Sequence, residues 1–199
     1  KTITINPAID VVSAYIWRGI PQDAAFPKGT PNIQPSVNCT IHSFSLGIWG
    51  TGNFNGTIKE IDLSAGYQFN DYFSLTLTDY NWTFDKSYFN YGKETDHVLE
   101  ATAHYEGCAN FPLTASLNTI WYGADKQLDG DQAYSTYMEL SFAIAPPCIV
   151  TIGAAMNESP LYQTGSAAIT NIALKVSKAI TISSTCHIPV FVSAGYNPT

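Results

Sequence analysis

Apolar and polar residues alternate along most of this chain, as they do in β-strands that have two different faces. The segment Thr57–Phe69 shows this best, because Ile61 and Leu63 share one face while Glu60 and Asp62 share the other. No helical periodicity of useful length accompanies it. The alternation, interrupted by turn residues, predicts an all-β chain of eleven strands. The expected strands are Ile3–Arg18, Asn32–Ile41, Phe44–Thr51, Thr57–Phe69, Phe73–Phe84, Val98–Tyr105, Leu113–Tyr122, Ala133–Ile144, Ile149–Asn157, Ala168–Val176 and Ile180–Tyr196. Within Phe73–Phe84 the apolar residues change from odd to even positions, so we expect a β-bulge near Thr78-Asp79.

The links between these strands alternate in length along nearly the whole chain. Long links include Gly19–Pro31 and Asp85–His97, and short ones include His42-Ser43, Asn70–Tyr72 and Ser177–Ala179. Outer-membrane barrels combine short periplasmic turns with longer outer loops, whereas a soluble sandwich has no reason to sort its loops this way. The pattern predicts one antiparallel up-and-down transmembrane β-barrel over residues 1–199, of about twelve strands.

Aromatic residues gather near the two ends of the expected strands. The four tryptophans each precede a long link, and the other aromatic residues lie near short turns. Two belts of amphipathic rings are what the two membrane interfaces favour. We therefore expect an aromatic girdle made of Trp17, Trp49, Trp82 and Trp121 at one end and of Tyr67, Phe69, Phe73, Tyr105, Phe111 and Phe142 at the other.

Composition strengthens this interpretation. Charged residues make up 13% of the chain, against about 25% in typical soluble domains. The longest apolar stretch, around Phe142–Met156, is broken by Pro146, Pro147 and Gly153, so no spanning helix is expected. The net charge of −7 argues against binding to nucleic acid.

Ionisable residues fall on the polar faces, which must point inward if the apolar faces meet lipid. An acidic lining would favour cations in a channel. Alternatively, the charges form a paired network that fills a narrow barrel, since buried charges need partners. Both interpretations stay open. The expected lumen-lining charged residues are Asp10, Arg18, Glu60, Asp62, Glu100, Glu139 and Lys175.

Neither catalysis nor a cofactor is expected. Glu60 and Asp62 share a face as the acids of a glycosidase do, but they lie within lipid-barrel patterning. No Gly-x-Ser-x-Gly motif occurs. The histidines lack the spacing of metal ligands, and no metal site is expected; they are His42, His97, His104 and His187.

The chain has four cysteines and no C-x-x-C motif. Cys108 and Cys148 fall in successive short turns, which raises the hypothesis of a disulfide between them. The alternative is that they are small apolar side chains without a bond. Four cysteines allow three connectivities, and the sequence does not choose among them.

Several short segments resemble the TorF-like family of small outer-membrane porins. They are Tyr15–Gly19, Phe44–Gly50, Glu60–Tyr67 and, late in the chain, Ile188–Phe191 before Asn197-Pro198. The resemblance implies a Gram-negative outer-membrane barrel of about this size with a pore function, and it carries over no catalytic residues. Members of that family usually finish with one more strand that ends in an aromatic residue. We therefore expect either a twelfth strand beyond the eleven or another form of barrel closure.

The sequence leaves three candidate functions open. The first is a channel for small solutes or ions, inserted in the lipid bilayer of the outer membrane. The second is a closed barrel that serves as a scaffold or partner subunit for other outer-membrane proteins. The third is a soluble β-sandwich or lipocalin-like binder, which should instead bury its Leu/Ile faces and expose Glu60, Asp62 and Glu139.

Overall fold

The computed structural model describes residues 3–82, 86–145 and 147–199 as an all-β chain. Eleven strands form one antiparallel sheet in which each strand pairs with the next along the chain, and β2 and β3 form a separate hairpin. Among the described residues no helix is long and apolar enough to cross a membrane. The strands are β1 (Ile3–Val12), β2 (Ile16–Trp17), β3 (Ile20–Pro21), β4 (Asn32–Ile41), β5 (Phe44–Asn53), β6 (Lys59–Gln68), β7 (Phe73–Asn81), β8 (Val98–Tyr105), β9 (Leu113–Gly123), β10 (Thr136–Ala145), β11 (Cys148–Ala155), β12 (Ala168–Ser183) and β13 (Cys186–Tyr196).

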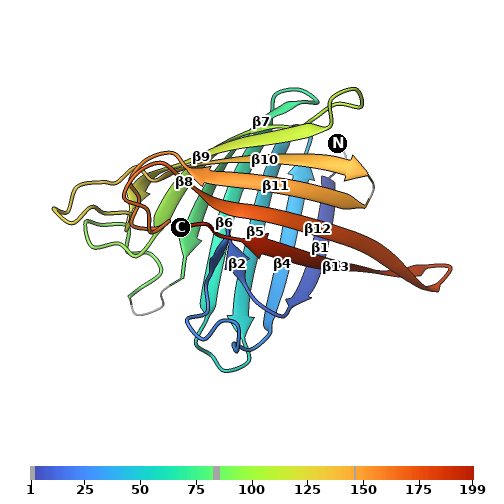
Figure 1. Ribbon diagram of the computed structural model, residues 1–199, viewed down its shortest axis with the longest axis horizontal. Helices are drawn as coiled ribbons and strands as arrows, with labels where there is room; N and C mark the ends of the chain where they lie inside the picture. Colours follow the sequence, from blue (N-terminus) through green and yellow to red (C-terminus); the bar gives the residue numbers. More distant parts are fainter. Residues whose placement is uncertain (1–2, 83–85, 146) are drawn as a thin grey trace.

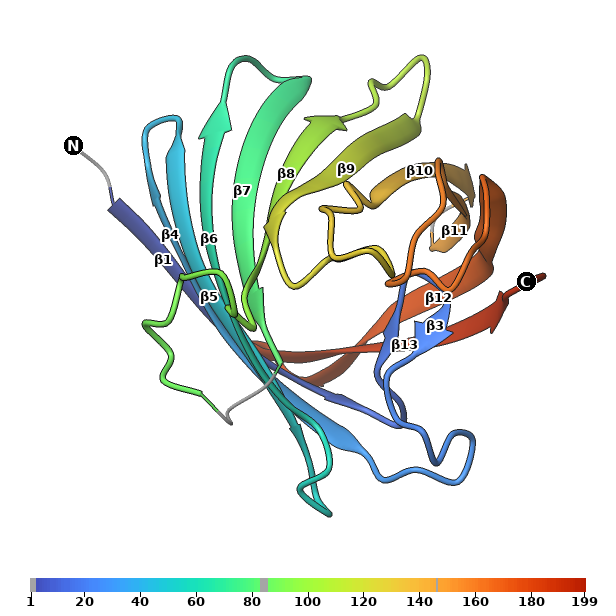
Figure 2. The same ribbon diagram turned by 90° about the vertical axis from the view of Figure 1, so that its left-hand side faces the viewer.

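The predicted all-β, up-and-down architecture is confirmed, but the predicted closed barrel is not formed. In the described chain β1 pairs with β4 and β13 pairs with β12, and no pairing joins β1 to β13. The sheet curls about an interior, into which the β2–β3 hairpin and the links that follow β9 and β11 project (Figures 1 and 2). We call the end of the sheet with the long links the mouth and the opposite end the short-turn end.

The first expected strand is too long. β1 ends at Val12, not at Arg18, because the chain leaves the sheet and turns back in the β2–β3 hairpin. Arg18 and Gly19 form that turn with φ values of 52° and 83°, which are left-handed conformations that end a strand.

The last two expected strands also have wrong bounds. Ser177–Ala179 is not a turn; these residues pair with Pro189–Phe191 inside a long ladder, and the chain reverses after Ser183. Continuing the ladder pairs Ile180 with Ile188, so the apolar residues stay on one face. The resulting hairpin projects beyond the neighbouring strands at the lower right of Figure 1.

β7 contains no bulge, contrary to the prediction. Its pairing with β6 and β8 runs without a register shift from Ser74 to Tyr80. The parity change has another cause: Tyr80 lies on the inner face, and Asp79 lies on the outer face under the link that follows β7. The expected strand end at Phe84 lies outside the described residues.

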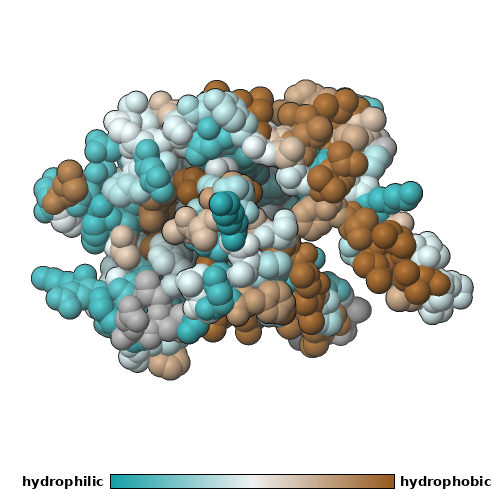
Figure 3. All heavy atoms as spheres, turned by 60° about the horizontal axis from the view of Figure 1, so that its bottom comes forward, coloured by the Kyte–Doolittle hydropathy of each residue, from teal (hydrophilic) through white to brown (hydrophobic). Residues whose placement is uncertain are grey.

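The two faces of the sheet have opposite chemistry. Residues directly across an antiparallel pair share a face, and such pairs include Ile48 with Leu63 and Leu140 with Ile152. These aliphatic rows are exposed: Leu63 and Leu140 are each 36% exposed, whereas Glu60 is 6% exposed. Hydrophobic residues gather over the strands and toward the short-turn end in Figure 3, and hydrophilic residues gather at the mouth, on the left. This burial is the reverse of a soluble protein's.

Candidate functional site

The mouth of the curled sheet holds the best-defined cluster of polar and aromatic side chains. The β2–β3 hairpin brings Arg18 there. A Cβ added to Gly19 would lie 2.0 Å from the carbonyl oxygen of Thr170 in β12, so only glycine allows the hairpin to approach this closely. The Thr170 hydroxyl donates a hydrogen bond to the Arg18 carbonyl oxygen at 3.3 Å. The hairpin is therefore docked against β12.

Arg18 makes a two-point ion pair with Glu100 of β8. Its Nη1 lies 2.6 Å from Oε2 and its Nη2 lies 2.8 Å from Oε1. The Tyr80 hydroxyl donates to Oε1 at 2.9 Å, and Arg18 Nη1 also donates to the Tyr162 hydroxyl at 2.5 Å. The Glu100 side chain is 1% exposed. Because a buried carboxylate is costly without a partner, the two-point contact with the Arg18 guanidinium offsets the cost of burying Glu100.

Aromatic rings surround the same guanidinium. Its Cζ lies 4.6 Å from the Trp17 ring centroid and 4.8 Å from that of Tyr137. Trp17 stacks on Tyr162 at 5.4 Å, and Tyr162 is fully buried. Gly153 makes room for Tyr137, since a Cβ there would lie 1.8 Å from the tyrosine hydroxyl. These rings and Ile20 make a small core inside the curled sheet at the mouth.

Glu60 and Asp62 lie side by side on the inner face of β6. The Tyr15 hydroxyl hydrogen-bonds to Glu60, and the Tyr15 ring packs on Trp49 at 5.5 Å. Burial, with the charges of Glu60 and Asp62, raises the pKa of Tyr15 well above its ordinary value, so Tyr15 stays protonated and donates. Within the described chain neither carboxyl forms an ion pair, and Asp62 Oδ1 is buried without a hydrogen-bond partner.

A cavity of about 260 Å³ opens beside Glu60 at the mouth. Aromatic rings, one carboxylate and two amide side chains form most of its wall. These residues are Tyr15, Trp17, Trp82, Glu60, Gln22 and Gln163. We call it the mouth cavity.

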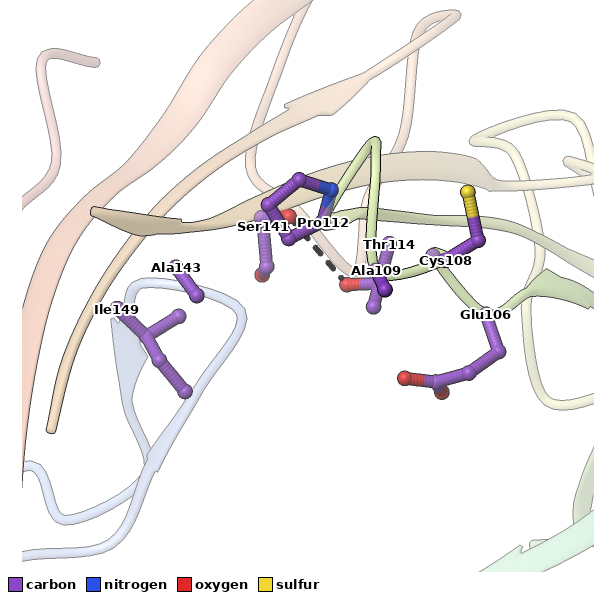
Figure 4. A pocket seen from close by; sticks show the side chains of 9 residues that line it. Glu106, Cys108, Ala109, Pro112, Thr114, Ser141, Ala143 and Ile149 are labelled. Carbon is purple, nitrogen blue, oxygen red and sulfur yellow. Dashed lines mark hydrogen bonds between the residues drawn. The ribbon is translucent and has the colours of Figure 1, made fainter. Parts of the chain in front are cut away.

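A second cavity of about 390 Å³ lies at the short-turn end. Figure 4 shows Ala143 and Ile149 on one side of it and Glu106 and Cys108 on the other. Thr114 donates to the Ser141 carbonyl oxygen at 3.5 Å across its floor. Its wall is mainly apolar, and the Glu106 carboxylate is engaged by His104 at 3.1 Å.

A polar cluster on the outer face marks where the exposed aliphatic rows of β7 end. Asp79 Oδ1 lies 2.7 Å from His97 Nδ1, and Tyr91 donates to Asp79 Oδ2 at 2.7 Å. Tyr91 stacks on His97 at 4.1 Å, and Asn81 contacts His97 Nε2 at 3.1 Å. The chain after Lys86 thus folds back over the outer face at the mouth.

The structure brings together four of the seven predicted charged residues, namely Arg18, Glu60, Asp62 and Glu100, at the mouth. Glu139 accepts a hydrogen bond from Tyr137 at 3.0 Å on the inner face of β10. Asp10 is on the inner face of β1 opposite Gln34, and Lys175 lies 4.4 Å from the Phe191 ring on β13. These last three residues do not join the Arg18 network.

Three of the four tryptophans do not lie on the outer wall, so the girdle prediction is wrong for them. Trp17 belongs to the inward hairpin, and Trp82 lines the mouth cavity. Trp49 pairs opposite Asp62 on the inner face of β5. Trp121, by contrast, is on the outer face and 46% exposed.

The aromatic residues of the short-turn end stay exposed or half-buried. Their role as a girdle remains a prediction. Those that are exposed are Tyr67, Phe69, Phe73, Phe111 and Phe142; Tyr105 is half-buried and packs on Phe73 at 5.2 Å.

The hypothesised Cys108–Cys148 disulfide is not formed, and all four thiols of the described chain are free, as the alternative interpretation holds. The two side chains lie on opposite sides of the sheet. Cys108 lines the inner cavity at the short-turn end, whereas Cys148 pairs opposite Val176 in the outer row of β11 and β12. Sharing one end of the sheet therefore does not bring them together.

The chain matches no known family model, no curated protein and no solved structure. The resemblance to TorF-like porins thus remains an expectation from the sequence. In the described segments, no group of three or more His, Cys, Asp or Glu residues is arranged to hold a metal ion.

Proposed function

We propose that this chain is an outer-membrane β-barrel protein whose interior forms a narrow, acid-lined pore for small solutes or ions. One observation supports this most: aliphatic rows cover the exposed outer face, while carboxylates such as Glu60 and Glu100 are buried inside. A lipid-facing wall needs the first arrangement and a polar interior needs the second.

A barrel that spans a bilayer must hydrogen-bond both of its edges, because the hydrocarbon offers no alternative partner. In the proposed barrel β1 and β13 are therefore joined by further strand pairing. One strand paired with both edges would supply it and would give the even number usual in bacterial barrels.

The charges of the inner face favour cations. Glu100 is neutralised by Arg18, but in the described chain no ion pair reaches Asp10, Glu60, Asp62 or Glu139. A ring of acidic side chains lowers the barrier for cations and raises it for anions. We therefore expect a cation-preferring pore.

A second candidate function is supported by the Arg18 network. Arg18 and the rings packed on it fill space inside the mouth, as plugs do in closed outer-membrane barrels. A barrel closed in this way would serve as a scaffold or partner subunit in a larger outer-membrane complex.

Planar-bilayer recording separates the two functions. The purified protein should give step currents, with a reversal potential on the cation side in a KCl gradient. Replacing Glu60→Gln and Asp62→Asn together should move that potential toward zero, whereas Asp79→Asn, on the outer face, should not. Trp17→Ser removes one of the rings that fill the mouth. Absence of current across many insertions, both for the native chain and for this variant, would reject the pore and leave the scaffold. Solubility without detergent would reject both.

A further inference from the structure

We infer that the mouth cavity binds a small organic cation of the alkylammonium class. This goes beyond the pore proposed above, because such binding requires the mouth to be folded but does not require conduction.

Three aromatic rings make the cavity suitable for an ammonium group. Tyr15, Trp17 and Trp82 reach it from separate segments, namely the link after β1, the hairpin strand β2 and the residue following β7. The electron-rich faces of Tyr15 and Trp82 attract a cation, and aromatic rings around one site are the usual means of holding a methylated ammonium. The Trp17 ring already carries the Arg18 guanidinium at 4.6 Å and contributes to the wall of the cavity. A volume of about 260 Å³ accommodates a ligand of only a few heavy atoms.

The carboxylate in the wall supplies the complementary charge. Glu60 is 6% exposed and lines the cavity, and Asp62 is beside it on β6 with one buried oxygen that has no partner among the described residues. The nearby Arg18 cannot compensate them, because both of its guanidinium contacts with carboxylate oxygens go to Glu100. A carboxyl group in a partly dry, aromatic site is costly to ionise, and a cation that enters the site stabilises its charged form.

Two other ligand classes fit the wall less well. A hard metal ion is usually held by several carboxylate or carbonyl oxygens, and Glu60 supplies one carboxylate among the described lining residues. A saccharide could stack on the tryptophans and use Gln22 and Gln163, but the Gln22 amide already donates to the Ile20 carbonyl oxygen at 3.1 Å. Neither ligand class uses both the rings and a carboxyl group that lacks an ion pair, as an alkylammonium ion does.

Isothermal titration of the detergent-solubilised protein tests this. The probes are tetramethylammonium and choline, with 3,3-dimethyl-1-butanol as the neutral isostere of choline and glucose as the saccharide. Both cations should bind saturably, and the isostere should bind at least about tenfold more weakly, since one charge contact is worth on the order of a factor of ten. Equal binding of choline and its isostere, or binding of glucose alone, would overturn the inference.

Matched variants locate the binding. Glu60→Gln should weaken choline binding about tenfold or more, whereas Glu139→Gln, on the same inner face but outside the cavity, should leave it within about twofold. Trp82→Leu should weaken it roughly threefold to thirtyfold, and Trp121→Leu on the outer face should not. Circular dichroism first confirms that each variant is folded. If Glu60→Gln does not fold, the isostere comparison and the tryptophan pair decide. Binding without current would reject only the pore, and current without binding would reject only this inference.

Discussion

Arg18 and Glu100 are 82 residues apart in the chain, yet they form a two-point ion pair inside the curled sheet, with N–O distances of 2.6 and 2.8 Å. The pair joins the β2–β3 hairpin to β8, and the Thr170 contact joins the same hairpin to β12. One inward-folded hairpin therefore connects strands that the sheet itself keeps four pairings apart.

Removing the cation should destabilise the fold strongly. Arg18→Ala leaves the Glu100 carboxyl group buried without its cationic partner, so we expect a loss of about 3–5 kcal/mol in the free energy of unfolding. Adding Glu100→Gln to that variant should recover a large part of the loss, because the uncompensated charge is then gone. Urea titration in detergent micelles measures both. A loss below about 0.5 kcal/mol for Arg18→Ala, the median range of exposed pairs, would show that the pair is not buried.

The hairpin's close approach to β12 gives a second prediction. Gly19→Ala combines a positive φ of 83° with a Cβ placed 2.0 Å from the Thr170 carbonyl oxygen. Gly56→Ala is its control, because φ is 75° there but nothing lies within 4 Å of the added Cβ. The control should lose roughly 1–2 kcal/mol through left-handed strain, and Gly19→Ala should lose clearly more. Equal losses in the same urea titration would mean that the hairpin is not docked.

Substitutions at two adjacent positions of β9 test which face of the sheet contacts lipid. Leu117 is in the outer row, opposite Met138, whereas Ser116 is in the inner row, opposite Glu139. In a bilayer Leu117→Arg should cost about 2–4 kcal/mol, while Ser116→Arg should cost less than about 1 kcal/mol because it faces a carboxylate. Unfolding from lipid vesicles measures the difference. The opposite order would mean that the faces are reversed.

The outer polar cluster should hold the link that follows β7 against the sheet. Asp79→Ala removes the acceptor used by His97 and Tyr91, so trypsin should cut faster at Lys86 and Lys93, which are exposed in that link. Ser74→Ala, on the inner face of the same strand, should leave the digestion rate unchanged. Mass spectrometry of the fragments measures the rate of digestion. Identical rates for the native chain and Asp79→Ala would show that the cluster does not hold the link.

Much of the sheet could be predicted from the sequence, because alternation reports directly which residues share a face. Glu60 and Asp62 are inside and Ile61 and Leu63 are outside, as that pattern indicates. The position of Arg18 could not be read in this way. It depends on a turn at Arg18-Gly19 and on a contact with Thr170, which is distant in sequence and leaves no local periodicity.

The girdle prediction fails for three of the tryptophans for a different reason. Their positions near the strand ends correctly predict that they lie at the mouth. A residue of an aromatic girdle must also lie on the outer face of the sheet. Trp49 has the parity of Ser45 and Gly47, and Trp82 has the parity of Thr78 and Tyr80, so both were predictable as inner residues. Parity within each strand was the signal that could have found the aromatic wall of the mouth cavity.

Spin-label accessibility in lipid vesicles tests most directly whether the outer face meets lipid. After the four cysteines are replaced by serine, single labels are placed in turn at Leu63, Leu117 and Leu140 and at Ser64, Ser116 and Ser141. We predict that the leucine positions collide mainly with dissolved oxygen, which concentrates in hydrocarbon, and that the serine positions collide mainly with a polar nickel chelate. A reversed pattern, or no difference between the two sets, would contradict a lipid-facing outer wall.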